Sequence, residues 1–222
     1  MKTARKLVAE ALGTAFLLAV VVGSGIMAER LSGGNVALAL LANAIATGAG
    51  LTALILTFGS VSGAHFNPVV TLAEAIDGRM GRGLAAAYVL VQTSGALAGV
   101  AAAHAMFGEH VFAYSMHARS GWPQWWSEFI ATAGLLLVIR GVSRAQPTAT
   151  PFAVGAYITA AYWFTSSTSF ANPSVTLARA FTPTFSGIRP TDVPGFIAAE
   201  TVAAIIATIF GRWLFRARAE AC

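Results

Sequence analysis

The chain has 222 residues, of which 56% are hydrophobic and only 10% are charged, whereas about a quarter of the residues in soluble domains are charged. This composition favours a membrane protein. The formal net charge of +5 comes from basic residues that are spread thinly between apolar runs, without the clustered bases and interleaved aromatics of a nucleic-acid-binding surface. The single cysteine, Cys222, excludes a disulfide framework and a Cys-x-x-Cys metal site.

Six stretches are long and apolar enough to cross a bilayer core as helices, which takes about 20 residues. The first begins after a basic start, as a secretory signal would. Its apolar run is longer than the usual signal core of about 7–15 residues and more spans follow, so we predict a retained helix. The six predicted spans are 6–27, 35–58, 83–106, 125–144, 151–168 and 194–215.

Two further apolar segments, 62–77 and 168–181, are too short to span a membrane. They contain "HFNPVVTLAEAI" and "FANPSVTLARAF". When Asn67 is aligned with Asn172, seven of the nine positions in 67–75 and 172–180 are identical. Asn caps a helix N-terminus and Pro suits the first helical turn, so both segments predict half-membrane helices that enter from loops. Irregular backbone at membrane depth requires surrounding protein or a watery cavity. The two segments therefore indicate a cavity.

The repetition extends through the chain. Glu10 in "AEALGT" and Glu128 in "SEFIAT" both precede a Thr by four residues, and "YVLVQ", which ends at Gln92, is loosely echoed by "FIAAE", which ends at Glu200. Each half of the chain holds three spans. Because three is an odd number, the second half crosses the membrane in the opposite orientation to the first. We predict one transmembrane domain made of inverted repeats, about 1–117 and 118–222, with the working site at the midplane between them.

Basic residues are distributed unevenly between the two ends of the predicted spans. Four lie at one end: Arg30, Arg119, Arg179 and Arg189. The others lie at the opposite end: Lys2, Arg5, Lys6, Arg79, Arg82, Arg140, Arg144, Arg212, Arg216 and Arg218. The positive-inside rule then predicts cytoplasmic termini, with the first half-helix entering from the cytoplasm and the second from outside.

Half-helices that enter from opposite faces would meet at the midplane with their N-termini. Each N-terminus presents about half a positive charge, which repels cations. The side-chain amides of Asn67 and Asn172 can cap these helices and also offer N–H donors to a passing molecule. A neutral solute that carries hydroxyl groups would find partners where an ion meets a barrier.

These motifs resemble the aquaporin and aquaglyceroporin family over essentially the whole chain, most specifically in "SGAHFNPVVTL", "NPSVTLARAF" and the Glu-Thr pairs. The resemblance implies an all-α membrane fold of six transmembrane helices and two re-entrant half-helices, with one pore per subunit and a homotetramer. It implies a passive channel in a bacterial inner membrane, with no cofactor and no metal. Residues Glu10, Glu128 and Gln92 would support the half-helix loops.

The sequence departs from the family pattern in both Asn-Pro boxes. The boxes usually read Asn-Pro-Ala, but here they read Asn67-Pro68-Val69 and Asn172-Pro173-Ser174. Most members follow the second box with an Arg at the outer constriction, and here that position is Val175. Arg179 lies one turn further on, about 5–6 Å along a helix axis, and we do not expect it to replace the missing Arg.

Family spacing without gaps places the other constriction residues at Thr47, Ala160 and Ser169. Together with Val175 they predict a wide, uncharged ring that offers two hydroxyls and admits neutral solutes larger than water. Wide filters without the Arg resemble those of metalloid-conducting members, including bacterial channels associated with arsenic detoxification. We therefore predict a facilitator for glycerol-like polyols, arsenous acid and related uncharged solutes, with water as a further candidate.

Other functions are less compatible with these residues. A water-selective aquaporin is the main alternative, and an ion-coupled secondary transporter would also have inverted repeats and buried carboxylates. An intramembrane hydrolase using Ser62 and His65 is disfavoured, because the channel motif explains both residues without a nucleophile. A membrane protein without conductance would have a blocked pore.

Several polar and aromatic side chains have simpler interpretations. His65 is expected in the cytoplasmic vestibule, where imidazole titration would offer a pH gate. His104, His110 and His117 are expected to be interfacial or solvated, with spacing too irregular for a metal site. Glu200 is expected to be structural, and Trp122, Trp125 and Trp126 to form an outer aromatic belt.

Overall fold

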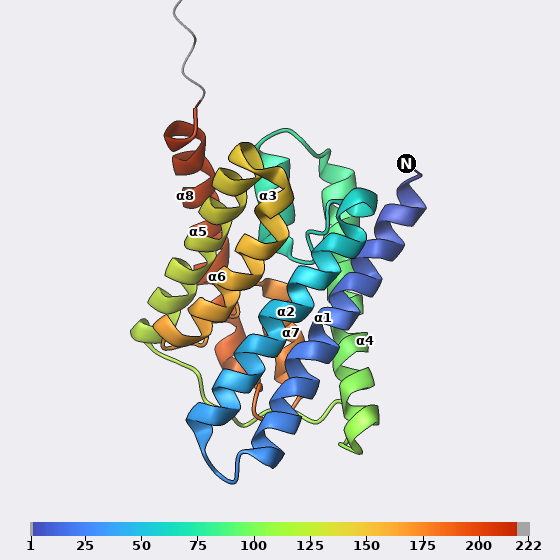
Figure 1. Ribbon diagram of the computed structural model, residues 1–222, viewed down its shortest axis with the longest axis vertical. Helices are drawn as coiled ribbons and strands as arrows, with labels where there is room; N and C mark the ends of the chain where they lie inside the picture. Colours follow the sequence, from blue (N-terminus) through green and yellow to red (C-terminus); the bar gives the residue numbers. More distant parts are fainter. Residues whose placement is uncertain (1, 217–222) are drawn as a thin grey trace, which may run out of the picture.

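The structure is a computed structural model that describes residues 2–216, so that Arg218 and Cys222 lie outside the described residues. Within this range the regular structure is entirely helical (Figure 1). The long helices are α1 (Thr3–Leu31), α2 (Val36–Ser62), α4 (Arg82–Phe107), α5 (Trp122–Ala145), α6 (Thr150–Phe164) and α8 (Val193–Leu214). The short helices are α3 (Pro68–Ile76) and α7 (Pro173–Ala178), with single 3-10 turns η1 (Pro147–Ala149), η2 (Arg179–Phe181) and η3 (Pro190–Asp192).

Five of the six predicted spans are long and apolar enough to cross a membrane as single helices: α1, α2, α4, α5 and α8. The remaining span, predicted over 151–168, ends earlier, because α6 stops at Phe164. Hydroxyl groups bond to the backbone just after this point: Thr165 Oγ1 donates to the Ala161 carbonyl at 2.7 Å and Ser167 Oγ accepts the Ser169 N–H at 3.2 Å. Such local bonds compete with helical ones and end the helix.

The two predicted half-helices are present, and each begins in the predicted way. The Asn67 side-chain oxygen accepts the Val69 N–H at 3.0 Å at the start of α3. The Asn172 oxygen accepts two N–H groups at the start of α7, those of Ser174 at 3.0 Å and Val175 at 3.3 Å. Pro occupies the first turn in both. The second half-helix has only six residues as an α-helix and continues as η2.

The two half-helices lie in opposite halves of the bundle, as inverted repeats require. Figure 1 shows α3 at the end that holds the N-terminus and the C-terminal end of α8, and α7 toward the other end. Each half-helix packs against both α4 and α8. Helix α1 packs against α2 and α4, while α5 packs against α8 and α6. The predicted fold is thus confirmed, with the two half-helices enclosed by the long ones.

Small residues in the runs "ATGAG" of α2 and "GALAGVAAA" of α4 allow close contact between the helices. A Cβ atom at Gly48 of α2 would lie 2.7 Å from the Gly155 carbonyl oxygen of α6. A Cβ atom at Gly99 of α4 would lie 2.1 Å from the Ala15 carbonyl oxygen of α1. Both distances are too short for a side chain, so glycine sets the separation of the helices that surround the centre.

One histidine prediction is wrong. His104 is fully buried, and its Nε2 lies 2.8 Å from Thr182 Oγ1. The residue is on the face of α4 that packs against the segment after α7, and the sequence pattern of α4 alone does not reveal this partner. His110 and His117 are exposed, as predicted. Trp122, Trp125 and Trp126 are exposed at the start of α5, where an aromatic belt was predicted.

A buried carboxylate joins α3 to the second repeat. Asp77, at the C-terminus of α3, has a side chain that is 3% exposed and forms ion pairs with Arg79 at 2.8 Å, Arg140 of α5 at 2.9 Å and Arg212 of α8 at 2.6 Å. Burial acts to raise the pKa of Asp77, but the interactions with Arg212 and Arg140 outweigh it and lower that pKa. Asp77 is therefore a charged link between the half-helix and two long helices.

Candidate functional site

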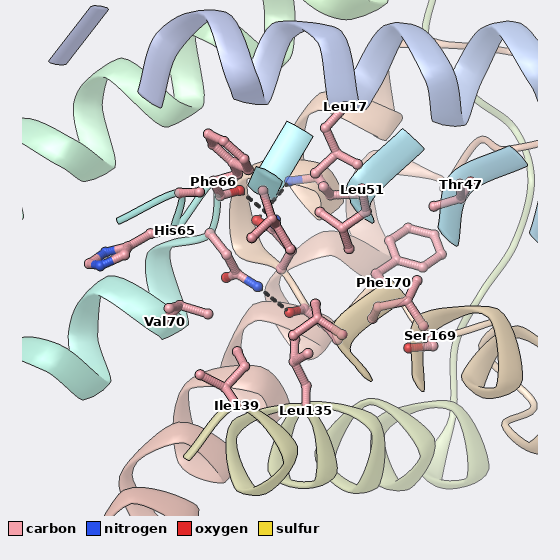
Figure 2. Close-up of a pocket in the computed structure, with 18 of the residues that line it drawn as sticks. Leu17, Thr47, Leu51, His65, Phe66, Val70, Leu135, Ile139, Ser169 and Phe170 are labelled. Atoms are coloured by element: carbon pink, nitrogen blue, oxygen red, sulfur yellow. Dashed lines mark hydrogen bonds between the residues drawn. The ribbon is translucent and has the colours of Figure 1, made fainter. Parts of the chain in front are cut away.

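A cavity of about 110 Å³ lies where the two half-helix loops meet. A water molecule needs at least about 10–15 Å³ of such space, so several fit. The wall is mainly apolar, with Leu17, Val21, Leu51, Ile55, Val70, Leu135, Ile139, Val154, Ile158 and Val175. Its polar side chains are Thr47, His65, Asn67, Thr150, Tyr162, Ser169, Asn172 and Arg179. Figure 2 shows Thr47, Ser169 and Phe170 toward one end and His65 toward the other.

The two box asparagines clasp each other's loops at the centre of this cavity. Asn67 Nδ2 donates to the Ala171 carbonyl at 2.7 Å, and Asn172 Nδ2 donates to the Phe66 carbonyl at 2.8 Å (Figure 2). The oxygen of each amide caps its own half-helix. An amide nitrogen has two N–H groups, so each Asn retains one donor that no protein carbonyl uses in these bonds.

The remaining box residues face the protein and do not line the cavity. Val69 is buried against Leu136 and Ala204, and Ser174 Oγ lies 3.1 Å from Thr93 Oγ1 of α4. Pro68 and Pro173 occupy the first turns of their helices. The changes from Ala to Val and Ser at the third positions therefore alter packing behind the cavity, and of the six box residues only Asn67 and Asn172 line it.

Two buried glutamates hold the loops from behind. The Glu10 carboxylate accepts two successive N–H groups, those of His65 at 3.0 Å and Phe66 at 2.8 Å. The Glu128 carboxylate accepts the matching pair, those of Phe170 at 2.9 Å and Ala171 at 2.7 Å. An ionised carboxylate can accept hydrogen bonds with both of its oxygens and has no donor group of its own. Both glutamates thus have the loop-supporting position that the resemblance implied.

The loops need this support because their backbone is strained at matching positions. Ala64 and Phe66 in the first loop have φ values of 50° and 49°, and Ser169 and Ala171 in the second have 50° and 48°. Left-handed conformations cost residues other than glycine of order 1–3 kcal/mol each, and they persist when surrounding bonds fix them. The glutamate bonds fix the N–H groups of Phe66 and Ala171 directly.

A third buried side chain stands beside each glutamate, and here the repeats differ. Gln92 Nε2 donates to Glu10 Oε2 at 2.8 Å and to Thr71 Oγ1 at 3.0 Å. Glu200, its counterpart, lies beside Glu128 and uses Oε1 to accept from the Asn172 N–H at 3.1 Å and from Thr176 Oγ1 at 2.7 Å. Its buried Oε2 has no hydrogen-bond partner among the described residues.

Three of the four predicted constriction residues line the cavity, and Ala160 does not. Ala160 is exposed on the outer face of α6, with Phe152 and Trp163. The stripe that lines the cavity consists of Val154, Ile158 and Tyr162, at helical spacing of four. Ala160 lies two positions from both Ile158 and Tyr162, about 200° around the helix. The spacing rule placed Ala160 wrongly on this face.

Tyr162 narrows the cavity where Ala160 was expected to widen it. Its hydroxyl lies 3.3 Å from Thr47 Oγ1, so the two side chains bridge α6 and α2. Ser169 is 2% exposed, and its hydroxyl has no hydrogen-bond partner within residues 2–216. Val175 lies in the wall as predicted. The wall near Thr47 therefore combines hydroxyl groups with the rings of Tyr162 and Phe170.

The expectation that this region is uncharged is also wrong, because Arg179 lines the cavity. Helix α7 ends at Ala178, and the Arg179 side chain packs over the Phe170 ring with Cζ 3.4 Å from the ring centroid. Its Nε donates to the Ser186 carbonyl. A count along the helix axis gives the position of the backbone, but not the reach of a long side chain.

A second arginine, from a distant segment, lies close to the same ring. Arg119 Cζ is 5.2 Å from the Phe170 centroid, Nε donates to the Gly187 carbonyl at 2.9 Å and Nη1 donates to the Ser167 carbonyl at 3.0 Å. The residue is 8% exposed. The sequence placed Arg119 only on the same side of the membrane as Arg179, and it contained no signal for this contact.

His65 lies at the opposite end of the cavity from Thr47 (Figure 2). Its Nδ1 is 3.0 Å from Thr71 Oγ1, and its ring meets the Tyr88 ring edge to face at 5.3 Å. Within the described residues no group of His, Cys, Asp and Glu side chains could hold a metal ion.

Comparisons with known proteins agree with this geometry. The Major intrinsic protein family model matches residues 1–185. The aquaglyceroporin AqpS of Rhizobium meliloti (strain 1021) is 55% identical over 212 residues, which cover 96% of this chain and 91% of that protein. Aquaporin NIP1-3 of Oryza sativa subsp. japonica is 33% identical over 218 residues, covering 96% and 73%. The X-ray structure of the aquaglyceroporin from Plasmodium falciparum superposes with a TM-score of 0.74 at 21% identity, covering 94% and 95% of the two chains, and supports the fold alone.

Proposed function

Because the chain belongs to the major intrinsic protein family, whose members are membrane channels and not enzymes, we propose that its central cavity is the pore of a passive channel for small uncharged solutes such as glycerol. The observation that carries this proposal is the pair of box asparagines. Each amide caps one half-helix, clasps the other loop and keeps a donor for a passing oxygen atom.

The chemistry of the wall suits a polyol better than an ion. A polyol has a carbon backbone that can follow apolar residues such as Val154, Ile158 and Val175, and hydroxyl groups that can exchange bonds with the Asn donors and the Ser169 hydroxyl. A cation would lose its water and meet the positive ends of two half-helices.

We assign the outer constriction to Thr47, Tyr162, Ser169 and Val175, which replaces Ala160 by Tyr162 in the ring expected from the sequence. Arsenous acid and related metalloids are also proposed solutes, because they are small and uncharged, carry several hydroxyl groups and would meet Val175 where an Arg would narrow the path. Water-selective conduction is the alternative, and it gains support from the contact between Tyr162 and Thr47.

We further propose a homotetramer in a bacterial plasma membrane with both termini in the cytoplasm, and one domain of two repeats, about 1–117 and 118–222. The orientation is supported by the basic residues that lie at the end of the bundle with the N-terminus, including the arginines around Asp77. Large apolar side chains exposed on the long helices, such as Leu90 and Ile209, suit contact with lipid or another subunit.

Stopped-flow light scattering on proteoliposomes tests the proposed function, with water, glycerol and arsenous acid as separate solutes and protein-free vesicles as the baseline. We expect fast glycerol flux that does not respond to an imposed ion gradient. Val175→Trp should reduce this flux at least about tenfold by filling the cavity, while Val202→Trp, on the exposed face of α8, should not. Fast water with excluded glycerol would instead establish the water-selective alternative, and accumulation against a gradient would refute a passive channel.

A further inference from the structure

Arg179 and Arg119 are two buried cations beside the cavity, and neither contacts a carboxylate through its guanidinium within residues 2–216. Buried charges are normally paired. The buried carboxylates of Glu128 and Glu200 belong to the same loop region, but three of their four oxygens accept bonds from loop N–H groups or a hydroxyl. The positive charge at this end of the cavity is therefore incompletely neutralised by contact.

The guanidinium of Arg179 is held in place and keeps free donors. The Phe170 face holds it from one side, with Cζ 3.4 Å from the centroid, and the Ser186 carbonyl fixes Nε. No acceptor among the described residues bonds to its two Nη nitrogens, and the residue lines the cavity. Arg119 uses Nε and Nη1 to bind carbonyls of the surrounding loops, and thereby fixes the segment that carries Phe170.

We propose that Arg179, with Arg119 beside it, determines the charge selectivity of this pore. Arg179 repels cations at the outer constriction and donates hydrogen bonds from Nη to the oxygen atoms of neutral polyhydroxy solutes. It does so from a position four residues after Val175, so that the ring at Thr47 and Val175 stays wider than an arginine at position 175 would leave it. The proposal rests on the proposed channel function and names the residues that give it selectivity.

Urea and guanidinium provide a matched test, because they share size and planar shape and differ in charge. In proteoliposomes, the unmodified channel should pass urea and glycerol and exclude guanidinium. Arg179→Met keeps an unbranched side chain over Phe170 but removes the charge, and it should raise the guanidinium flux at least about tenfold with urea flux changed by less than about threefold. Arg179→Lys should stay close to the unmodified channel.

Two further variants keep the test decisive. The double variant Val175→Arg, Arg179→Met should exclude guanidinium again, because it returns a cation to the same constriction. Arg30→Met removes an exposed arginine at the same end of the bundle and should change neither flux. Guanidinium flux equal to urea flux in the unmodified channel would overturn the proposal even if Arg179→Met does not fold, as would an Arg179→Met channel that still excludes guanidinium. Absence of both urea and glycerol flux in the unmodified channel would contradict the proposed function itself.

Discussion

Replacing Glu128 by Gln tests the idea that a carboxylate holds the second half-helix loop under strain. Both oxygens of Glu128 accept backbone N–H groups, from Phe170 at 2.9 Å and Ala171 at 2.7 Å. Gln has almost the same shape, but its side chain has one acceptor and one donor group. In Glu128→Gln the side-chain NH₂ group must face one of the two loop N–H groups, and that loop group is left without an acceptor in a fully buried site.

The magnitude follows from the two bonds. Hydrogen bonds to a charged group contribute about 1.5–3 kcal/mol each, and the neutral bond that Gln can keep contributes about 1 kcal/mol. The free energy of unfolding should therefore fall by about 2–5 kcal/mol, which corresponds to a decrease in the melting temperature of about 10 °C for a chain of this length. The loop should also relax from its left-handed conformations at Ser169 and Ala171, because they would no longer be fixed.

Thermal unfolding in detergent and glycerol flux in proteoliposomes measure the two consequences. We expect both a lower melting temperature and a reduced flux, since Asn172 follows directly after the relaxed segment. Glu29→Gln makes the same chemical change at an exposed position on α1 and should alter neither quantity. A Glu128→Gln protein with an unchanged melting temperature and unchanged flux would show that the loop does not depend on the carboxylate.

Three other changes probe different parts of the structure. Glu200→Gln should preserve or raise the melting temperature, because the Gln oxygen can accept from the Asn172 N–H and from Thr176. Its NH₂ group would face Glu128, as that of Gln92 faces Glu10. A fall in the melting temperature of several degrees would show that the second carboxylate is needed. Tyr162→Ala should increase the flux of polyols longer than glycerol by removing the side chain that contacts Thr47, whereas Ala160→Leu on the exposed face should leave flux unchanged. A flux that changes in Ala160→Leu but not in Tyr162→Ala would restore Ala160 to the pore wall. Asp77→Asn should lower the free energy of unfolding by about 1–3 kcal/mol at pH 7. Because the pKa of Asp77 is lowered in the folded protein, this difference from the unmodified protein should persist down to about pH 4 and disappear below it as the carboxylate is protonated. A difference that does not change down to pH 2 would contradict a role for the charge.

The sequence was sufficient for features that are determined locally or by internal repetition. Asn67-Pro68 and Asn172-Pro173 carry their own capping chemistry, so both half-helices could be placed without knowledge of their partners. Glu10 and Glu128 could be related because each lies in the same Glu-Thr pattern on the first helix of a repeat. Since the two repeats form similar loops, a role argued for one glutamate applied to the other.

Features that depend on how the loops are built could not be predicted in this way. The family spacing from Asn172 back to Ala160 crosses a Ser- and Thr-rich segment, and the helix face at position 160 depends on where that segment ends the helix. Arg179 was judged by its backbone position, although its side chain turns back onto Phe170. The partners of Arg119 and His104, and two of the three arginines around Asp77, come from distant parts of the chain. The residues next to them in the sequence give no sign of these contacts.

The differences between the repeats are as informative as their similarity. At the midplane the repeats are nearly equivalent: each Asn caps one half-helix and binds the other loop, and each loop rests on one glutamate. Toward Thr47 the equivalence ends, because two arginines lie on the Phe170 ring, whereas within residues 2–216 no arginine lies on the ring of His65, which aligns with Phe170. The two helix termini at the midplane repel cations, whereas Thr47, Tyr162 and Ser169 set the width and the hydroxyl groups that a neutral solute meets at the other end. We therefore expect substitutions around Phe170 and Tyr162 to change which neutral solutes pass, and substitutions of Asn67 or Asn172 to affect all solutes alike.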